Sequence, residues 1–407
     1  MRAFDNQISD RGPPAAEAAP VATCDFIVRA ETASKIAASN ADVVDRDARF
    51  PLEAFEAIRV GKLLSMAIPR ELGGEGASPA DVADVCAVLG AACGATGMIF
   101  AMHQIKVACL MRHAGGNAWQ LGFQRRIAER QLLVASSTTE GVTGGDIRSS
   151  QAAIQMIGER IGLVRDASVI SYGAHADAIV TTARRAAASI GSDQVLVAFE
   201  RPDYSLEPTG SWDTLGMRGT CSVGYLLRAE GFADQVLPEP YERIHNQTMA
   251  PYAHLYWSST WQGIAAGSFR RARAFVRHAS RNSGGRMPPG AAHLTRARVT
   301  LETLRGAVQA GLATFNRYAS EPEGLTAAHV QLALNFLKVE ASELAAATVM
   351  SATRACGLAG YRNDGEFAMG RYLRDILSAP IMIHNDRLLA NAEAAVLMSE
   401  PPVSLSL

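Results

Sequence analysis

Two stretches of the sequence combine residue types that can do chemistry. In the stretch "SSTTEGVTGGD", Gly144 and Gly145 have no Cβ, so their backbone N–H groups can approach a pyrophosphate closely. In the stretch "APIMIHNDRLLANAE", three apolar residues precede His384, Asn385 and Asp386, whose side chains could exchange protons or hydrogen bonds with a ligand. Turn glycines and satisfied histidines are common, so each signal needs support from the elements around it.

The composition limits the class of protein. The chain of 407 residues is 48% hydrophobic and 19% charged, and its 39 Lys and Arg nearly balance 40 Asp and Glu, for a formal charge of −1. This balance provides no bulk attraction to nucleic acid or to an acidic membrane surface. The six cysteines show neither a C-x-x-C pair nor zinc-type spacing, so we expect no metal site and reduced thiols in a cytoplasmic protein.

The pattern along the chain predicts an α+β protein that is mainly α. Helical periodicity runs from 30 to 135, β-prone runs such as "DAIVTTA", "QVLVAFE" and "GYLLRAEGF" fall within 136–245, and helices return in 246–407. We therefore expect an N-terminal α-domain, a small middle β-barrel domain and a C-terminal four-helix bundle. Residues 1–29 lack the apolar core of a secretory signal and are expected to form a flexible leader.

Three helical details follow from the same pattern. The uncharged run Val85 to Met102 meets the length of a membrane span, but "CGATG" in its middle predicts two closely packed helices of a protein core instead. Long helices are expected over 326–356 and again over 367–398. One face of a further helix is formed by Leu301, Leu304, Val308, Leu312 and Phe315.

Four separated parts of the chain, in order, resemble the acyl-CoA dehydrogenase family. "PRELGGEGAS" is similar to the family's N-terminal loop. "SSTTEGVTGGD" resembles its T-E-P-x-x-G-S-D flavin loop, and "SVISYGAHAD" follows at the distance of the strand beside the flavin. "WDTLGMRGTCS" resembles L-G-M-R-x-T/S-x-S, and "RACGLAGY" with "RYLRDI" resembles the Q-x-x-G-G-x-G and R-D signatures of the last helices. Together these stretches cover nearly the whole chain.

The resemblance implies a homo-oligomeric FAD enzyme, either a dimer or a tetramer. An extended segment can cover the flat isoalloxazine ring while its backbone addresses the rim. Arg281 aligns with a family Arg that reaches a cofactor phosphate across a subunit interface. Three departures from the family pattern, Gly145, Gly284 and Arg354, alter the phosphate and adenine contacts. The implied cofactor-binding residues are Thr139, Gly144, Gly145, Val169, Ile170, Ser171, Arg281, Gly357 and Gly360.

The base of an ordinary family member is missing from its expected positions. Dehydrogenation of an acyl thioester needs a carboxylate against the α-carbon. The resemblance puts Met382 at the Glu position, and the alternative helix position, within Ala250 to Ser259, contains no acidic residue. Three readings are open: Asp386 is the base of a conventional dehydrogenase, the protein is non-catalytic and serves flavin binding or assembly, or the flavin uses O2. We favour the third, because a monooxygenase branch that resembles this family lacks the Glu.

The oxygenase interpretation requires an enclosed, water-poor site with hydrogen-bond donors near the ring. His384, Asn385 and Asp386 are the catalytic candidates. The expected substrate is an acyl thioester or related small molecule of secondary or aromatic-acid metabolism. Electrons would come from the substrate or a flavin reductase, whereas a dehydrogenase would pass them to an electron-transfer flavoprotein. The predicted substrate site comprises Met98, Phe100, His103, Ser222 and Met382, with Met102 as a further wall, although core packing explains an apolar stripe equally well.

Overall fold

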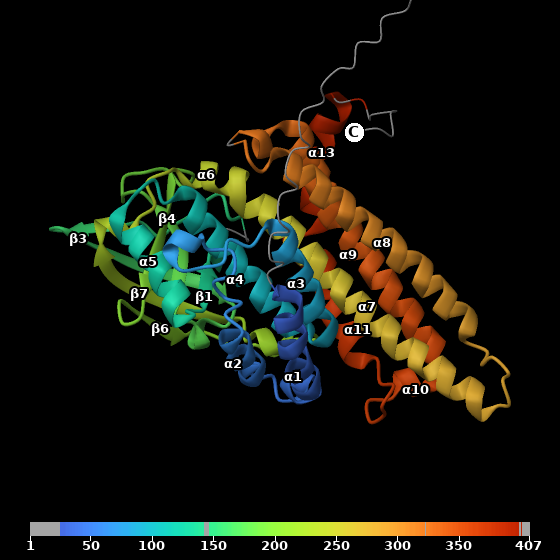
Figure 1. The fold of residues 1–407 in the computed structure, drawn as a ribbon. Coiled ribbons are helices and arrows are strands. Elements are labelled where there is room, and N and C mark those ends of the chain that lie inside the picture. The colour runs from blue at the N-terminus through green and yellow to red at the C-terminus, as the bar shows by residue number, and fades with distance from the viewer. Residues whose placement is uncertain (1–24, 142–145, 322, 399, 401–407) are drawn as a thin grey trace, which may run out of the picture.

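The computed structural model describes residues 25–141, 146–321, 323–398 and 400. It has an N-terminal helical part, a middle β region and a C-terminal helical part, as the sequence predicts (Figure 1). The first helix begins at Phe26, so residues 26–29 of the predicted leader are helical. None of the helices in the described part of the chain combines the length and apolar character of a membrane span.

From residue 25 onwards, where the structure describes the chain, the N-terminal part is built from five α-helices that pack around buried alanines and larger apolar side chains. The helix Pro79–Ala92 begins at a capping box in which Ser78 and Asp81 each accept a hydrogen bond from the other's backbone N–H group, with Pro79 at the first helical position. Cys93 has an extended backbone and separates this helix from the next one, Gly94–His113. The prediction of two helices over the uncharged run Val85 to Met102 is therefore confirmed. The helices are α1 (Phe26–Arg46), α2 (Leu52–Val60), α3 (Pro79–Ala92), α4 (Gly94–His113) and α5 (Ala118–Arg130).

Glycines let α3, α4 and the later helix α7 (Ala250–Asn282) approach one another closely. A Cβ on Gly90 would lie 2.5 Å from the carbonyl oxygen of Thr260 on α7, and a Cβ on Gly97 would lie 2.6 Å from the Gly90 nitrogen. Any larger residue at these positions would force the helices apart. This contact holds the N-terminal helices against the C-terminal bundle.

The described residues of the middle region form two sheets. One has the order β1-β4-β5, with β1 (Val134–Ser137) parallel to β4 (Ala178–Arg184) and β5 (Gln194–Glu200) antiparallel to it. The other is antiparallel, with the order β2-β3-β7-β6. The sheets pack against each other through β1, β3, β5 and β7, so the barrel-like domain is open rather than one closed ladder. The second sheet comprises β2 (Gln155–Ile157), β3 (Arg160–Ile170), β6 (Tyr204–Pro208) and β7 (Val223–Phe232).

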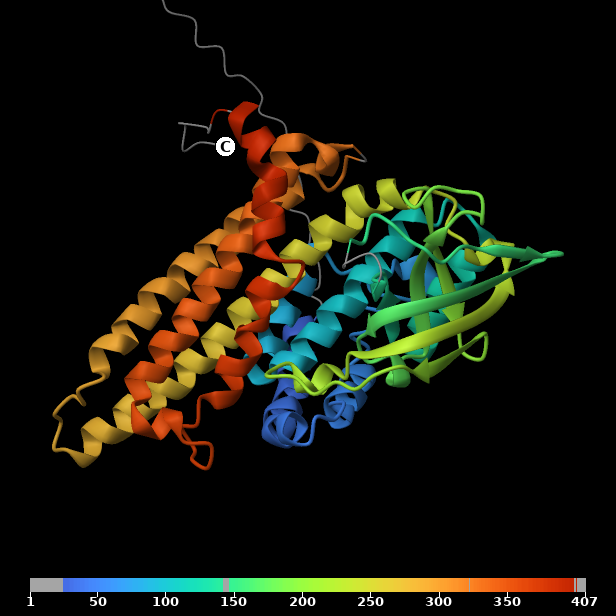
Figure 2. The ribbon, with the colours of Figure 1, turned by 180° about the vertical axis from the view of Figure 1, so that it is seen from behind.

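In the C-terminal part, the described residues include three long helices that pack along one another (Figure 2). Short helix α6 (Tyr241–Ile244) and a π-helical turn, η6 (His245–Met249), lead into α7 (Ala250–Asn282). Then follow α8 (Ala291–Tyr318) and α9 (Ala328–Cys356). The predicted stripe lies on α8, where Leu301, Leu304 and Phe315 are buried and Val308 and Leu312 are partly buried.

The predicted last long helix, 367–398, is instead divided into three. Pro380 lacks the N–H that would let the first segment continue, and Ile383 and His384 have left-handed backbones with φ of 50° and 51°. The fourth position of the predicted bundle is therefore filled by short segments along α9. After α10 (Leu358–Tyr361) these are α11 (Gly370–Ile376), α12 (Ser378–Ile381) and α13 (Asn385–Met398).

Candidate active-site cavity

A cavity of about 580 Å³ lies where the β region meets the start of α7. Its volume falls within the range of small-molecule and cofactor sites, which is roughly 300–1,000 Å³. Six parts of the chain contribute to its wall: α4, the end of β1 with the loop after it, the end of β3, η6 with the first turns of α7, α9, and the turn before α13 with the start of that helix. Residues almost 300 positions apart in the sequence therefore share one chamber.

Three of the residues predicted to bind the cofactor line this cavity. Thr139 follows β1, and Val169 and Ser171 lie at the end of β3. The two segments are held together because the hydroxyl of Ser168 donates to Thr139 Oγ1 at 3.1 Å. Ile170 alternates to the other face of the strand and is fully buried in the core. Gly144 and Gly145 lie outside the described residues.

A chain of hydroxyl groups fixes the hydrogen-bonding direction of Ser171. Thr220 donates to the carbonyl of Met217 at 2.8 Å, which uses its single proton. Ser222, 2.8 Å from Thr220, must then donate to it, and Ser171, 2.8 Å from Ser222, must donate in turn. Ser171 therefore offers only lone pairs to the cavity. Ser222, predicted to contact substrate, lies behind Ser171 and orients it.

The turn under this hydroxyl chain is anchored from the C-terminal helices. The N–H of Met217 donates to Asp375 Oδ1 at 2.7 Å. Asp375 belongs to the "RYLRDI" stretch of α11 and is buried, and burial raises its pKa to about 6. Met217 and Cys221 adopt left-handed backbones on either side of the turn, so a specific anchor is needed to hold it. The signatures "WDTLGMRGTCS" and "RYLRDI" are thus in direct contact through this hydrogen bond.

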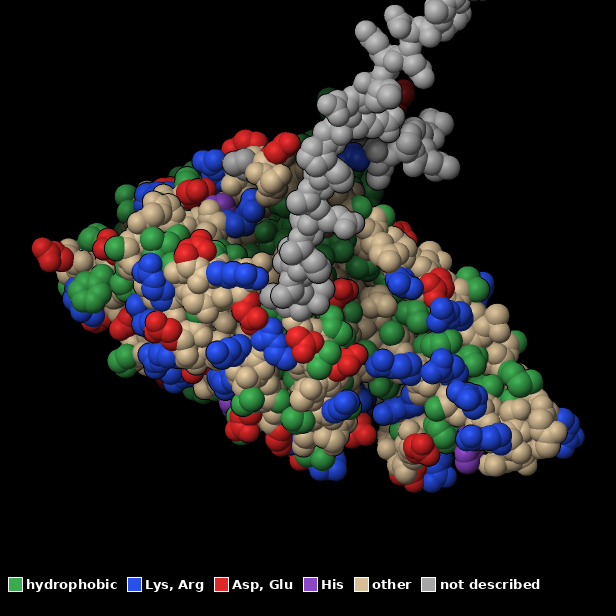
Figure 3. Space-filling model, in the orientation of Figure 1, with side chains coloured by type: hydrophobic (Ala, Val, Ile, Leu, Met, Phe, Trp, Pro, Cys, Tyr) green, Lys and Arg blue, Asp and Glu red, His purple; other side chains and the backbone are tan. Residues whose placement is uncertain are grey.

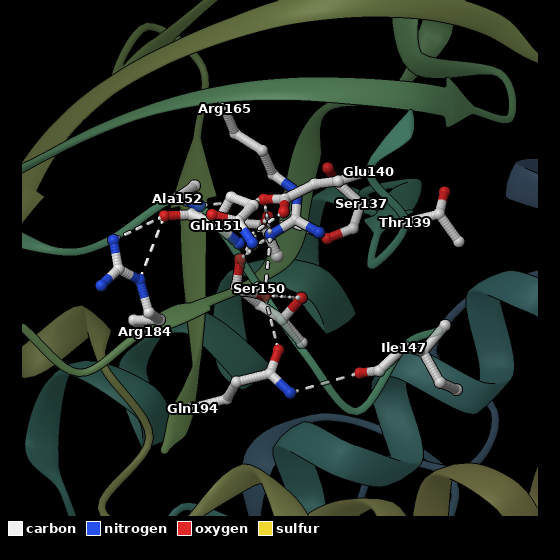
Figure 4. Close-up of polar contacts among 12 residues, drawn as sticks. Ser137, Thr139, Glu140, Ile147, Ser150, Gln151, Ala152, Arg165, Arg184 and Gln194 are labelled. Carbon is white, nitrogen blue, oxygen red and sulfur yellow. Dashed lines mark hydrogen bonds and ion pairs between the residues drawn. The ribbon is translucent and has the colours of Figure 1, made fainter. Parts of the chain in front are cut away.

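The loop after β1 is fixed by a buried ion pair (Figure 4). Glu140 is 3.2 Å from the guanidinium of Arg165 on β3, and both side chains are buried. The carboxylate also accepts the backbone N–H groups of Gln151 at 2.6 Å and Ala152 at 3.1 Å. Arg165 donates as well to the carbonyl oxygen of Thr182 on β4. This pair ties the cavity-lining Thr138–Thr139 segment to both sheets.

Three residues predicted to line a substrate cavity on α4 lie elsewhere. Met98 and Phe100 are buried in the core and do not line the cavity, whereas Met102 does. His103 is fully buried: its Nε2 donates to the carbonyl of Leu64 at 2.8 Å, and its Nδ1 accepts from the N–H of Val134 at 3.0 Å. Burial lowers the pKa of His103 to about 4. His103 is a neutral brace between elements, since both ring nitrogens are occupied.

The turn before α13 presents apolar side chains to the cavity. Met382 and Ile383 line it, whereas His384 and Asp386 are exposed and Asn385 is buried against α9. None of the three predicted catalytic residues is part of the cavity wall. A left-handed turn at this point reverses the direction of successive side chains, and linear alignment with a family loop cannot show that reversal.

Asn385 instead completes a buried polar cluster. Its Oδ1 accepts from Lys338 Nζ at 2.6 Å, and its Nδ2 donates to Ser342 Oγ at 3.0 Å and Glu343 Oε1 at 2.9 Å. Lys338 also donates to the carbonyl of Ala379 at 3.1 Å. Burial lowers the pKa of Lys338 to about 8. The cluster fastens α12 and α13 to α9 and so positions Met382.

Sequence reasoning missed several polar residues of the cavity. Lys106 is one turn after Met102 on α4, and an i, i+4 extension of the predicted apolar wall would have found it. His254 and Trp257, on one face of α7, also line the cavity, and the indole N–H of Trp257 has no hydrogen-bond partner among the described residues. Asp146 is the one carboxylate among the described lining residues, and it accepts from the N–H of Arg148 at 3.0 Å.

Comparison with known proteins identifies the fold. Residues 27–129 match the family described as "Acyl-CoA dehydrogenase, N-terminal domain". Over 198 residues the chain is 24% identical to the "Probable acyl-CoA dehydrogenase YngJ" of Bacillus subtilis (strain 168). That match covers 48% of this chain and 52% of YngJ, so it spans about half of the relative's length.

Solved structures resemble the chain over nearly its whole length. FMN-bound TdsC from Paenibacillus sp. A11-2 superposes with a TM-score of 0.79 at 17% identity, covering 94% of this chain and 100% of TdsC. Methanesulfinate monooxygenase MsuC from Pseudomonas fluorescens superposes with a TM-score of 0.78 at 18% identity, covering 93% and 98%. The chain has the acyl-CoA dehydrogenase-like fold.

Within this acyl-CoA dehydrogenase-like fold, the remaining predicted cofactor residues lie far from the cavity. Arg281 is exposed near the end of α7, and it is 28 residues from Ala253, which lines the cavity. At ~1.5 Å per residue this separation is roughly 42 Å. Gly357 and Gly360 follow the end of α9, near the same end of the bundle (Figure 1). These residues cannot contact a ligand in the cavity of their own chain.

Proposed function

We propose that the chain is a flavin-dependent oxidoreductase that uses O2 to oxidise a small molecule in the 580 Å³ cavity. One observation carries this proposal. At the position of the usual base, the wall is formed by Met382 and Ile383, while His384 and Asp386 are exposed and do not line the cavity. A dehydrogenase needs a carboxylate within hydrogen-bond reach of the substrate, whereas an oxygenase needs an enclosed and water-poor chamber.

The residues of the cavity suit a flavin. Val169 offers an apolar surface for the ring, and Ser171 offers a hydrogen-bond acceptor for the N–H groups of its rim. The unpartnered indole N–H of Trp257 would find an acceptor in a ligand that carries carbonyl groups. When bound, the flavin would supply electron transfer and the reaction with O2. The chain's own residues would hold the ring, exclude water and orient the substrate.

We expect FAD as the cofactor from the resemblance, and the FMN of TdsC makes FMN the alternative. For FAD, the phosphates and adenine would extend from the cavity towards a second copy of the chain. Exposed arginines are spaced along one face of α7 and form no ion pairs within the described residues. This arginine stripe consists of Arg270, Arg273, Arg277 and Arg281.

The arginine stripe supports a homo-oligomer in which one chain completes the cofactor site of another. Figure 3 shows Lys and Arg side chains gathered towards the end of the bundle, at the lower right. A phosphate-bearing cofactor protruding from a neighbouring cavity would compensate this charge. Dimer and tetramer are both compatible with this arrangement.

The second candidate is a conventional acyl-CoA dehydrogenase that passes electrons to an electron-transfer flavoprotein. The N-terminal family match and the likeness to YngJ favour it. Since Asp386 lies outside the cavity wall, its base would be Asp146, the one carboxylate among the described lining residues. That carboxylate is occupied by its own loop through the Arg148 N–H. A non-catalytic role in assembly is the third possibility.

The deciding experiment is anaerobic stopped-flow absorbance. The purified protein is first tested for bound flavin, and the released cofactor is identified as FAD or FMN by mass. The flavin is then reduced without oxygen and mixed with oxygenated buffer. A transient absorbance distinct from the reduced and oxidised forms supports an oxygenase. Reoxidation without a transient, together with anaerobic bleaching by acyl-CoA thioesters, indicates the dehydrogenase. A colourless protein that takes up neither flavin contradicts both.

A further inference from the structure

Lys106 is a buried cation on the wall of the cavity. It lies on α4, and only 4% of its surface is exposed. Its ammonium group donates to the sulfur of Met249 at 3.3 Å. Among the described residues it has no ion pair and no other hydrogen bond. A lysine charge at this depth is uncommon unless something compensates it.

The one contact of Lys106 does not compensate its charge. An ammonium group has three N–H donors, and a thioether sulfur is a weak acceptor. The same sulfur also accepts from the hydroxyl of Tyr241 at 3.2 Å, so two donors share it. Burying an unpaired ammonium costs several kcal/mol. The arrangement is therefore complete only when a ligand supplies an acceptor with negative charge.

The elements around Lys106 add little negative charge. Burial lowers the pKa of Lys106 to about 8, and the electrostatic effect of Cys109 on the same helix opposes this shift. On η6, burial also lowers the pKa of His245, and the charges of Arg148 and Lys106 lower it further, whereas Asn246 and Asp146 raise it. Asp146 lies 3.8 Å from the guanidinium of Arg148. The Asp146–Arg148 ion pair therefore contributes almost no net charge. Lys106 remains the uncompensated charge.

The π-helical turn makes this arrangement possible. Helix η6, His245–Met249, adds a residue to the turn and brings both His245 and Met249 to the cavity wall. Such turns are rare and occur frequently at functional sites. His245 Nδ1 is 2.9 Å from Asn246 Oδ1, so its Nε2 is the nitrogen left for a ligand.

We infer that Lys106, with His245 beside it, binds a carboxylate-like oxyanion on the substrate. This inference rests on the proposed function, in which the cavity holds both flavin and substrate. Val169 and Ser171, which are proposed to contact the flavin ring, come from the end of β3, whereas Lys106 and Met249 come from α4 and η6. The oxyanion would thus lie on the helical side of the chamber, and the substrate would enter with its anionic end towards that side.

Benzoate and its neutral isostere benzamide test this inference. Their affinities are measured by isothermal titration calorimetry on the full-length protein, both as purified and flavin-loaded. Wild type is expected to bind benzoate at least tenfold more tightly than benzamide. Lys106→Met, which keeps the length of the side chain and removes the charge, should abolish the preference. In wild type the preference should also decline as the pH rises above about 8, because Lys106 loses its proton.

Lys35→Met is the matched control. Lys35 is an exposed lysine on α1 that does not line the cavity. The benzoate preference should survive in this variant. Circular dichroism confirms that both variants are folded before affinities are compared.

Two outcomes overturn the inference. Equal binding of benzoate and benzamide by wild type, or an unchanged preference in Lys106→Met, removes the oxyanion from this site. A tenfold loss of FMN or FAD affinity in Lys106→Met, with the benzoate preference intact, assigns the lysine to the cofactor's phosphate instead. The proposed function is tested separately: a protein that fails to react with O2 but keeps the benzoate preference refutes the oxygenase and leaves the oxyanion site standing.

Discussion

The hydrogen-bond direction of Ser171 is set by residues that never reach the cavity. Because Thr220 gives its proton to a carbonyl, the whole hydroxyl chain points away from the cavity, and Ser171 can only accept. Reduction adds an N–H to the rim of a flavin. A fixed acceptor at Ser171 therefore favours the reduced form of the proposed cofactor.

Removing the middle hydroxyl tests this polarity. In Ser222→Ala, Ser171 is free to turn its proton into the cavity, so the preference for the reduced flavin should fall. A hydrogen bond contributes about 0.5–1.5 kcal/mol net, which for two electrons corresponds to a midpoint potential roughly 10–30 mV more negative. Potentiometric titration measures the shift, and Thr220→Ser, which keeps the chain intact, is the control. A potential that is unchanged or more positive contradicts the argument.

Individual residues could be predicted only where side-chain direction followed from the element. Val169 and Ser171 lie at the end of β3, on either side of the buried Ile170, and both line the cavity. On α4, Met102 lines the cavity, as predicted, whereas Met98 and Phe100 lie in the core, and the lining residue Lys106 was not predicted. The sequence shows that a helix is apolar nearly all round, but not which face meets a cavity.

At the scale of elements, the loop after β1 depends on one buried pair. Arg165 and Glu140 are both removed from solvent, and the Glu140 carboxylate also holds the backbone N–H groups of Gln151 and Ala152. Breaking one half of a buried pair leaves a buried charge uncompensated, which costs about 3–5 kcal/mol.

Glu140→Gln should therefore destabilise the β region by about 3 kcal/mol and weaken flavin retention. The glutamine side chain keeps the shape of the glutamate, but its neutral amide cannot compensate the charge of Arg165. Its NH₂ group would also face the backbone N–H groups of Gln151 and Ala152, which need an acceptor. Chemical unfolding followed by circular dichroism measures the loss. Glu53→Gln, which breaks the half-exposed pair with Arg49, is the matched control and should cost less than about 1 kcal/mol. Equal effects of the two substitutions would show that the buried pair is not the anchor.

The C-terminal turn is the second element that a local pattern could not predict. The sequence "CGATG" predicts the break in the helix between α3 and α4, because glycine and other small residues interrupt a helix. No such signal marks Ile383 and His384, where the left-handed backbone is imposed by Asn385 and its contacts with α9. Tertiary contacts decide this turn, and a sequence window does not contain them.

Asn385→Ala tests whether this residue positions the turn. It should lower stability by about 2 kcal/mol, because Lys338 loses its shortest acceptor and stays buried. His384→Ala, one residue away and exposed, should change stability by less than about 0.5 kcal/mol. Urea unfolding of both variants measures the difference. A stable Asn385→Ala protein that has lost only the reaction with O2 would instead support the catalytic role that the sequence suggested.

For the whole molecule, the order of α, β and α parts could be predicted because each part has its own periodicity. The cavity could not, since it is assembled from six parts of the chain whose relative orientation depends on packing. The resemblance implies that Arg281 reaches a cofactor across a subunit interface. The length of α7 separates Arg281 from the cavity by roughly 42 Å within one chain, as such an arrangement requires.

This separation means that Arg281 can serve a cofactor only in another copy of the chain. Arg281→Glu should weaken flavin binding at least tenfold without unfolding the protein, since the side chain is exposed and forms no ion pair among the described residues. Ser171→Trp should block the cavity while leaving Arg281 intact. Each variant alone is expected to retain little flavin.

Mixed oligomers distinguish action within a chain from action between chains. When the two variants are co-expressed with different tags and mixed assemblies are isolated, one site in each mixed dimer pairs an intact cavity with an intact Arg281 from the other chain. Flavin content measured by absorbance should recover to about half of the wild-type value. Recovery requires the assembly itself, so it would support the homo-oligomer and the trans role of Arg281 together. If Arg281→Glu alone retains full flavin, the arginine does not bind the cofactor, and the stripe on α7 must bind something else.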